Sequence, residues 1–199
     1  MTQQIVLATG NRGKLAELSA LLADLPVALI NQAELHVDSV PETGTTFVEN
    51  AIIKARHAAR QTGLPALADD SGLEVNALNG APGIRSARYA GESATDADNI
   101  DRLLEALSEC DDRSAIFRCV IVFMRHADDP MPLIVSGSWR GEVALARAGD
   151  QGFGYDPVFL LPELGKTAAD LSAAEKNARS HRGQALRALR TQLQVVLPL

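Results

Sequence analysis

The sequence has few cysteines, the residues that form disulfides or bind structural metals in small folds. Only two of its 199 residues are cysteines, Cys110 and Cys119, and neither lies in a CxxC pair or a Cys/His ligand spacing. We therefore expect two unpaired thiols in a reducing compartment, with no disulfide or zinc scaffold. A chain of this length can bury a sizeable core without such staples.

Long hydrophobic runs are also missing. The longest unbroken run of aliphatic, aromatic and sulfur-containing residues covers residues 119–124, whereas a membrane-spanning helix needs about 20 apolar residues. Residues 1–4 lack the basic charge that opens a secretory signal. These features predict a cytoplasmic protein with no membrane partner.

Positive charge is in the minority. The chain has 19 Lys and Arg against 25 Asp and Glu, which gives a formal net charge of −6. A nucleic-acid-binding surface is strongly basic, so this balance argues against a nucleic-acid partner while still allowing a local basic pocket. Apolar residues at 46% and charged residues at 22% are ordinary globular values, which excludes a disordered or fibrous protein.

Apolar periodicity alternates between strand-like and helix-like segments along the chain. We predict strands at residues 5–8, 26–30, 64–68 and 115–124, and an antiparallel hairpin at residues 133–145. Helices are predicted after residue 13, from Thr46 to about Gln61, from Thr95 onward, and from Ser172 to about Gln194. Residues 79–94 are expected to form a long surface loop. The alternation predicts an α/β fold with a mixed sheet.

A glycine-containing turn joins the first predicted strand to the first predicted helix. It reads Thr9-Gly10-Asn11-Arg12-Gly13-Lys14. A strand-to-helix turn presents backbone N–H groups and the helix dipole to an anion, so phosphate is the natural ligand. It is not a Walker A loop, because the glycines are too close and Leu15 stands where Ser or Thr would be needed. The alternative is an ordinary turn with Lys14 solvated.

Two adjacent carboxylates follow the third predicted strand. Asp69 and Asp70 come directly after residues 64–68, at the strand end where α/β proteins tend to bind ligands. Adjacent acids repel unless water or a cation offsets them, and Mg²⁺ prefers carboxylate oxygens. Asp70 with a second acid such as Glu42 could hold Mg²⁺, and Asp69 or Asp70 could polarise an attacking water. The alternative is a solvated acidic turn.

Two further segments carry groups that suit a nucleotide. Phe153-Gly154-Tyr155-Asp156-Pro157 combines aromatic rings with a carboxylate, which would suit a base and a ribose, or else a buried aromatic pair beside a turn. Near the start of the last predicted helix, Lys176, Arg179 and Arg182 lie three residues apart, so they could share one face and bind phosphate. His181 lies among them. The alternative for these cations is a solvated helix face.

Taken together, these ordered motifs resemble the inosine triphosphate pyrophosphatase family (Ham1-like, RdgB-type). The resemblance covers essentially the whole chain. Besides the segments above, it rests on shorter motifs, namely Glu42-Thr43-Gly44, Phe47 with Glu49-Asn50-Ala51, Lys54-Ala55, Ala68-Asp69-Asp70-Ser71-Gly72-Leu73, Ala81-Pro82-Gly83, Ser86-Ala87-Arg88-Tyr89, Gly152 and Ser180-His181-Arg182-Gly183.

The resemblance implies a role for each matching residue. Residues 9–14 would bind the triphosphate, with Asn11 and Lys14 in direct contact and Lys54 adding charge. Glu42 and Asp70 would bind Mg²⁺, with Asp70 as the general base, Asp69 in support and Ser71 touching substrate. The nucleoside pocket would be formed by Phe153, Gly154, Tyr155, Asp156, Lys176, His181 and Arg182.

The resemblance also implies an activity and an architecture. Family members hydrolyse deaminated purine nucleoside triphosphates (ITP, dITP and XTP) to monophosphate and pyrophosphate. They form one domain, here residues 1–199, with two lobes around a substrate cleft on an elongated mixed sheet, and are usually homodimers. Two rival functions remain, a pyrophosphatase acting on modified pyrimidine or standard nucleotides and a nucleotide-sensing module without turnover.

Overall fold

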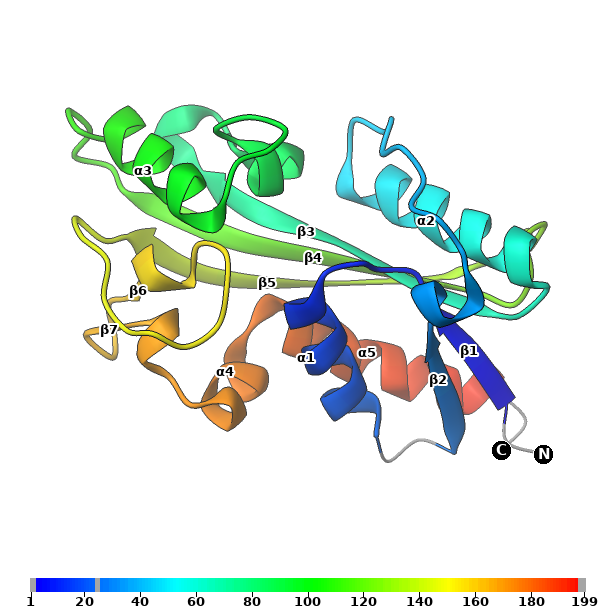
Figure 1. Ribbon diagram of the computed structural model, residues 1–199. Helices are drawn as coiled ribbons and strands as arrows, with labels where there is room; N and C mark the ends of the chain where they lie inside the picture. The colour runs from blue at the N-terminus through cyan, green and yellow to red at the C-terminus, as the bar shows by residue number, and fades with distance from the viewer. Residues whose placement is uncertain (1–2, 24–25, 197–199) are drawn as a thin grey trace. The chain divides into compact units, whose positions relative to one another are not determined.

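A computed structural model describes residues 3–23 and 26–196 (Figure 1). Its strands are β1 (Gln3–Leu7), β2 (Val27–Asn31), β3 (Ala66–Val75), β4 (Ser114–Met124), β5 (Leu133–Val143), β6 (Phe159–Leu161) and β7 (Lys166–Thr167). Its helices are α1 (Arg12–Leu22), α2 (Phe47–Thr62), α3 (Asp96–Ala106), α4 (Ala173–Arg179) and α5 (His181–Val196). Short 3₁₀ helices lie at η1 (Gln32–Leu35), η2 (Asn76–Leu78), η3 (Gly83–Arg88), η4 (Asp156–Val158) and η5 (Ala168–Asp170).

The strands form a mixed sheet in the order β2-β1-β3-β4-β5-β6-β7. β1 runs parallel to β2 and to β3, whereas β6 runs antiparallel to β5 and to β7. This confirms the predicted α/β class with a mixed sheet. No helix in the described ranges is long and apolar enough to cross a membrane.

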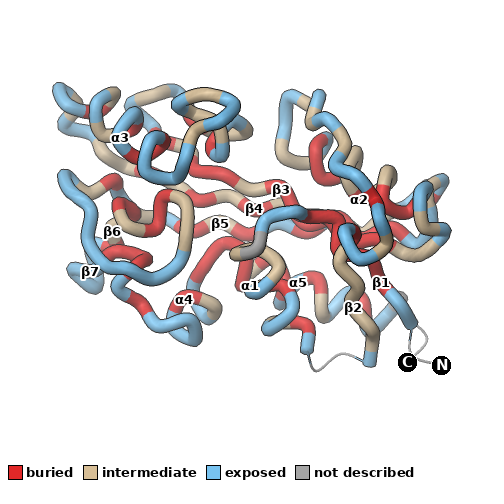
Figure 2. The backbone as a smooth tube through the Cα atoms, in the orientation of Figure 1, coloured by how far each residue is buried: buried red, intermediate tan, exposed pale blue. Residues whose placement is uncertain are grey.

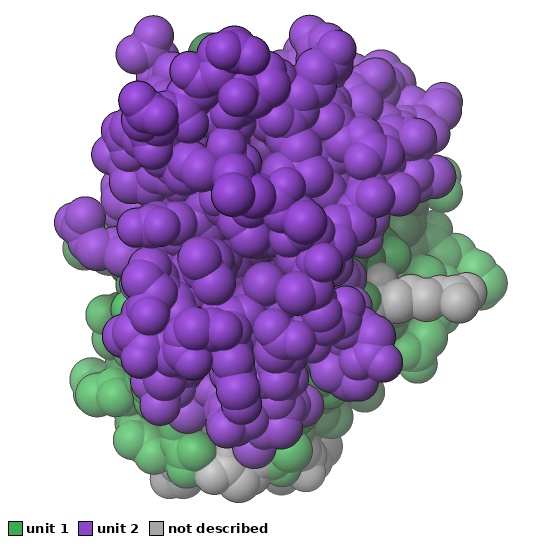
Figure 3. Space-filling view, turned by 90° about the vertical axis from the view of Figure 1, so that its left-hand side faces the viewer, with its two compact units in different colours: residues 1–70, 119–137, 182–199 green, residues 71–118, 138–181 purple. Residues whose placement is uncertain are grey.

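The chain divides into two compact units (Figure 3). Unit 1 comprises the described residues of 1–70, 119–137 and 182–199, and unit 2 comprises residues 71–118 and 138–181. Each unit has a hydrophobic core of its own. The substrate cleft between two lobes stays a prediction.

In unit 1, helices pack on both faces of the buried strands (Figures 1 and 2). Successive strand residues point to opposite faces, and two separate apolar clusters result. Residues Leu7, Leu67 and Ile121 pack with Leu18 of α1 and Leu186 of α5. The alternate residues Val6, Ala68 and Val122 pack with the alanine face of α2, formed by Ala51, Ala55, Ala58 and Ala59. Odd-numbered residues of β3 in this unit therefore face α1 and α5, and even-numbered residues face α2.

Helix α2 begins and ends where its sequence predicts. The Thr46 hydroxyl accepts from the Glu49 backbone N–H, and the Glu49 carboxylate accepts from the Thr46 backbone N–H, which completes a capping box. Gly63 ends the helix with φ of 69°, a left-handed conformation that favours glycine. Because the alanine face is small, the helix can lie close to the sheet.

Unit 2 is built on α3 and a cluster of aromatic rings. Helix α3 starts with a capping box between Thr95 and Asp98, as predicted, and buries Ile100 and Leu103. The rings of Phe117 and Trp139 lie 4.5 Å and 5.2 Å from that of Phe159, measured between centroids. Tilted pairs at such separations are favourable beyond the area they bury.

Two predictions about turns and loops are wrong. The expected hairpin at residues 133–145 is one continuous strand, β5, which passes through Gly141. An added Cβ at Gly141 would lie 2.5 Å from the Leu160 carbonyl oxygen, so glycine permits close approach of another segment here and does not mark a turn. Residues 79–94 are not all loop, since they include η3 (Gly83–Arg88).

The predicted helix from Ser172 to about Gln194 is two helices. Ser180 is extended (φ −62°, ψ 158°) and separates α4 from α5. Lys176 and Arg179 therefore lie on α4, and Arg182 lies on α5. The prediction that these three cations share one helix face is wrong.

Candidate active site

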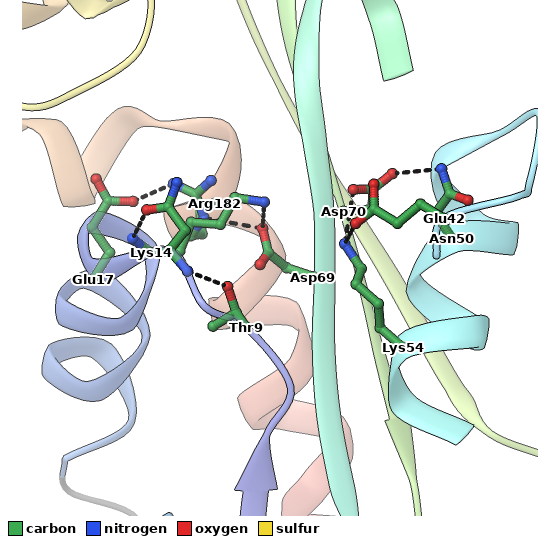
Figure 4. Close-up of polar contacts among 10 residues, drawn as sticks. Thr9, Lys14, Glu17, Glu42, Asn50, Lys54, Asp69, Asp70 and Arg182 are labelled. Atoms are coloured by element: carbon green, nitrogen blue, oxygen red, sulfur yellow. Dashed lines mark hydrogen bonds and ion pairs between the residues drawn. The ribbon is translucent and has the colours of Figure 1, made fainter. Parts of the chain in front are cut away.

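The two adjacent aspartates lie within a strand. The prediction that Asp69 and Asp70 follow a strand end is wrong, because β3 continues to Val75. Both are buried, with exposed fractions of 1% and 6%, so the alternative of a solvated turn is wrong as well. Alternate residues of a strand share a face, so Asp69 lies on the face of Leu67 and points toward α1 and α5. Asp70 lies on the face of Ala68 and points toward α2 (Figure 4). Each carboxylate thus has its own partners.

Asp70 forms a cluster with side chains from α2 and the loop before it. Lys54 Nζ lies 2.9 Å from Asp70 Oδ1 and 2.8 Å from Glu42 Oε1, so one ammonium bridges the two carboxylates. Asn50 Nδ2 donates to Asp70 Oδ2 at 3.4 Å (Figure 4). The predicted metal-binding pair and Lys54 are therefore close together.

Burial makes Asp70 a stronger base than a solvated carboxylate. Desolvation raises the pKa of Asp70 above its ordinary value, and the attraction of Lys54 opposes that rise without cancelling it. For Lys54, desolvation lowers the pKa, but the charges of Asp70, Asp69 and Glu42 outweigh it and raise the pKa of the ammonium. The site therefore combines a firmly protonated lysine with a carboxylate suited to accept a proton.

Asp69 forms a different cluster on the other face. Its Oδ2 lies 3.0 Å from Lys14 Nζ on α1 and 3.5 Å from Arg182 Nε on α5. Arg182 also donates to the Glu17 carboxylate through its Nη1 (Figure 4). Burial raises the pKa of Asp69, but Lys14 and Arg182 outweigh burial and hold the pKa well below its ordinary value. Asp69 therefore stays negatively charged at neutral pH.

The predicted phosphate turn is the start of α1. Asn11 is the N-cap, and its Oδ1 accepts from the Lys14 backbone N–H at 3.0 Å. Thr9 Oγ1 accepts from the Asn11 backbone N–H at 3.2 Å. An added Cβ at Gly10 would meet nothing within 4 Å, so space is open beside the turn. Gly13 lies in the first turn of α1, and the Arg12 side chain is outside the described part of the chain.

In unit 2, the predicted nucleoside-binding residues form a second polar cluster. Asp156 is 2% exposed and accepts from Lys176 Nζ at 2.6 Å and from the Phe153 backbone N–H at 2.8 Å. Lys176 Nζ lies 4.8 Å from the centre of the Phe153 ring, a cation–π contact. Gly154 has φ of 59°, and its N–H donates to Asp96 at 2.7 Å. The segment is thus rigidly held.

Two predicted pocket residues of unit 2 are buried among apolar groups. Tyr155 is 4% exposed, and its hydroxyl donates to the Ser86 carbonyl oxygen at 2.9 Å. His181 is also 4% exposed and stacks on Phe117, with 4.7 Å between ring centres. The geometry of Tyr155 matches the alternative of a buried aromatic residue beside a turn.

Ser71, which the resemblance places next to the substrate, follows Asp70 on β3 and is half-buried.

The sequence analysis assigned no role to two residues of these clusters, one that contacts Arg182 and one that contacts Asp70. Glu17 lies three residues after Lys14 on α1 and accepts from Arg182. Asn50 is fully buried and contacts Asp70. The spacing of one helical turn from Lys14 to Glu17 was the available signal for the first. For Asn50, the only signal was a polar residue in an otherwise alanine-rich helix face.

The donor set at Asp70 fits a hard cation. Mg²⁺ takes oxygen ligands and is usually held by one or two carboxylates plus waters and substrate phosphates. Glu42 and Asp70 supply such a pair, because their carboxylates lie close enough together for both to contact the Lys54 ammonium. In the described ranges, no group of three or more His, Cys, Asp or Glu could hold a metal ion on its own. The remaining ligands would come from substrate and water.

Comparisons with known proteins agree with the motifs. The model of the Ham1 family matches residues 5–192. A protein from Pectobacterium atrosepticum, named dITP/XTP pyrophosphatase, is 60% identical over 94% of this chain and 96% of its own length. A protein of the same name from Escherichia coli O157:H7 is 59% identical over 94% of this chain and 96% of its own length.

Solved structures show the same fold. A HAM1 protein from Coxiella burnetii superposes with a TM-score of 0.91 at 58% identity and covers 97% of this chain and 99% of its own. The Ham1 protein of Staphylococcus aureus gives a TM-score of 0.87 at 44% identity, with 98% and 100% covered. The likeness therefore extends over the whole fold.

Proposed function

This chain belongs to the Ham1 family, and from that premise we propose that it hydrolyses ITP, dITP and XTP to the monophosphate and pyrophosphate. Such an activity would remove deaminated purine nucleotides from the pool that supplies DNA and RNA synthesis. The names of the relatives that are about 60% identical over nearly the whole chain support the substrate class. The observation that carries the chemistry is the bridge from Lys54 to both Glu42 and Asp70.

Hydrolysis of a phosphoric anhydride depends on positioning and charge neutralisation more than on covalent catalysis. Glu42 and Asp70 would hold Mg²⁺, which when bound supplies Lewis-acid neutralisation of the phosphate charge. Asp70 accepts a proton from the attacking water, a role that its raised pKa favours. Lys54 fixes the orientation of both carboxylates and adds positive charge beside the phosphates.

The turn at the start of α1 binds the triphosphate in this proposal. Backbone N–H groups at a helix N-terminus favour anions, and no acidic residue lies in the first turn of α1. The residues involved are Thr9, Gly10, Asn11, Arg12, Gly13 and Lys14, with Ser71 touching substrate beside Asp70. Attack at the α-phosphorus releases pyrophosphate, whereas attack at the γ-phosphorus would release phosphate.

Base selection rests on the purine 6-position. Inosine and xanthosine carry an oxygen acceptor there, which a fixed N–H of Arg182 or His181, or a backbone N–H, would meet, whereas adenine presents an amino donor. A buried donor left without an acceptor costs about 1–3 kcal/mol, so adenine is disfavoured. Phe153, Gly154, Tyr155, Asp156 and Lys176 complete the nucleoside pocket in this proposal, with the Phe153 ring available for stacking. We further infer a cytoplasmic homodimer.

The test measures pyrophosphate and phosphate released from inosine, adenosine and guanosine triphosphates, with Mg²⁺ and with EDTA, at one low enzyme concentration. We expect pyrophosphate from inosine triphosphate, its loss with EDTA, and its loss in Asp70→Asn while nucleotide binding remains measurable. Equal rates on all three nucleotides would contradict the base selection. Turnover in Asp70→Asn like that of the wild type would remove Asp70 from the mechanism, and no turnover in the wild type would favour a nucleotide-sensing module.

A further inference from the structure

Asn50 joins two parts of the Asp70 cluster. It is the fourth residue of α2 and is fully buried. Its Oδ1 accepts from the Gly44 backbone N–H at 2.9 Å, and its Nδ2 donates to Asp70 Oδ2 at 3.4 Å (Figure 4). One side chain therefore contacts both the loop that carries Glu42 and the carboxylate of Asp70.

The orientation of the Asn50 amide follows from its neighbours. A backbone N–H can only donate, so the atom facing Gly44 must be the amide oxygen. The amide nitrogen then has to face Asp70, whose carboxylate oxygen accepts. Reversing the amide would place donor against donor and acceptor against acceptor. The Asn50 side chain is therefore locked by both contacts at once.

The loop before α2 is shaped to reach Asn50. An added Cβ at Gly44 would lie 2.7 Å from Asn50 Oδ1 and 2.6 Å from Glu49 Cβ. Only glycine permits this approach without displacing a neighbour. The next residues are fixed as well, because the Glu49 carboxylate accepts from the Thr45 and Thr46 N–H groups at 2.8 Å and 2.9 Å. The backbone two residues from Glu42 is thus tied to α2.

We propose that Asn50 is a positioning residue that sets the separation of the Glu42 and Asp70 carboxylates by tying the Glu42 loop to the side chain of Asp70. The effect of Asn50 on the rate of nucleotide hydrolysis rests on the proposed function. Groups that orient metal-binding carboxylates typically change metal affinity or activity by about 10–100-fold when removed. Asn50 acts through Asp70 and Glu42.

Unit 2 contains a matched control. Asn99 is the fourth residue of α3 and also follows a capping-box acid. It is 2% exposed, its Oδ1 accepts from the Ala90 N–H at 2.8 Å, and its Nδ2 donates to the Ala87 carbonyl oxygen at 3.1 Å. Asn50 and Asn99 thus tie a loop to a helix in the same way, but only Asn50 contacts a carboxylate of the proposed site.

The experiment compares Asn50→Leu, Gly44→Ala and Asn99→Leu in the full-length protein. Asn50→Leu removes both hydrogen bonds at similar volume. Gly44→Ala keeps Asn50 but drives its amide away through the added methyl group. For each variant we would measure kcat and KM with inosine triphosphate, Mn²⁺ affinity without nucleotide by electron paramagnetic resonance, and hydrogen exchange of the backbone amide at position 44 by NMR. Urea unfolding monitors folding.

We expect kcat to fall about 10–100-fold in Asn50→Leu and in Gly44→Ala, with KM changed less than kcat. Mn²⁺ affinity should weaken by about tenfold or more, and the Gly44 amide should exchange faster in Asn50→Leu than in the wild type. Asn99→Leu should lose similar folding stability while its kcat and Mn²⁺ affinity stay near the wild-type values.

Wild-type values of kcat and Mn²⁺ affinity in folded Asn50→Leu would overturn the proposal, as would an equal loss in Asn99→Leu. If Asn50→Leu does not fold, Gly44→Ala decides between the same outcomes. Should the wild type release no pyrophosphate, the proposed function fails, and Mn²⁺ affinity and Gly44 exchange still test the positioning role.

Discussion

Asp69 and Asp70 are neighbours in sequence, and their replacement by asparagine should have opposite consequences. Asp69 is buried against Lys14 at 3.0 Å and Arg182 at 3.5 Å. Each attraction amounts to about 5 kcal/mol at an effective dielectric constant of about 20. Part of this is offset by the several kcal/mol needed to desolvate the carboxylate. Removing one member of such a buried network costs about 3–5 kcal/mol, which we expect for Asp69→Asn at pH 7.

Asp70→Asn should affect stability little and turnover strongly. Burial already disfavours the charge of Asp70, as the direction of its pKa shift indicates. Lys54 keeps Glu42 as a partner at 2.8 Å when the Asp70 charge is removed. We therefore expect a change in unfolding free energy within about 1 kcal/mol, with pyrophosphate release abolished.

Urea unfolding of both variants at pH 7, followed by circular dichroism, measures the difference directly. The midpoints should separate clearly while the m-values stay alike. If Asp69→Asn lowers the free energy of unfolding by less than about 1 kcal/mol, the interpretation of Asp69 as a structural anion is refuted, because removing a carboxylate from a buried network with two cations should cost more than that. An equal loss in both variants would refute the division of the pair between two faces.

Three further outcomes follow from local geometry. Lys176→Met removes the ammonium that lies 2.6 Å from Asp156, so urea unfolding should show lower stability and the KM for inosine triphosphate should rise more than kcat falls. Gly10→Ala should leave the unfolding midpoint unchanged, because its Cβ meets nothing within 4 Å, while raising KM through the methyl group beside the anion-binding turn. Hydrogen bonds from Arg125 hold the pKa of Asp129 well below its ordinary value. The ionised Asp129 therefore adds to the free energy of unfolding above about pH 4, and this contribution is lost as the pH falls through the folded-state pKa. Asp129→Asn should therefore lower the melting temperature at pH 7, and the difference from wild type should shrink as the pH is lowered toward about 2.

Signals carried by a few consecutive residues predicted the structure well. The capping boxes at Thr46 and Thr95 mark the true starts of α2 and α3, and Gly63 ends α2. These signals succeed because the hydrogen bonds that satisfy a helix end come from residues within one turn. The turn at residues 9–14 was predicted from its glycines and its place between a strand and a helix, and Asn11 does cap the helix that follows it. That this turn binds phosphate stays a prediction.

Features that depend on distant segments were predicted poorly. The apolar run of β3 stops at Ala68, yet the strand continues through Asp69 and Asp70 to Val75. What keeps the aspartates in the sheet is pairing with neighbouring strands and cations from α1, α2 and α5, none of which is local in sequence. The break at Ser180 was missed because no glycine or proline marks it.

The placement of Asp69 and Asp70 on opposite faces explains how a strand can carry two adjacent buried carboxylates. Each has its own cations, Lys14 and Arg182 for Asp69 and Lys54 for Asp70, so their mutual repulsion is not the dominant interaction. Asp69 therefore stays charged and holds α1 and α5 to the sheet, while Asp70 keeps the raised pKa that general-base chemistry favours. In the proposed function, one strand would in this way supply a structural anion and a general base from consecutive positions. Exchanging the two environments would remove both pKa shifts, because Lys14 and Arg182 together outweigh the burial of Asp69, whereas Lys54 does not cancel the effect of burial on Asp70.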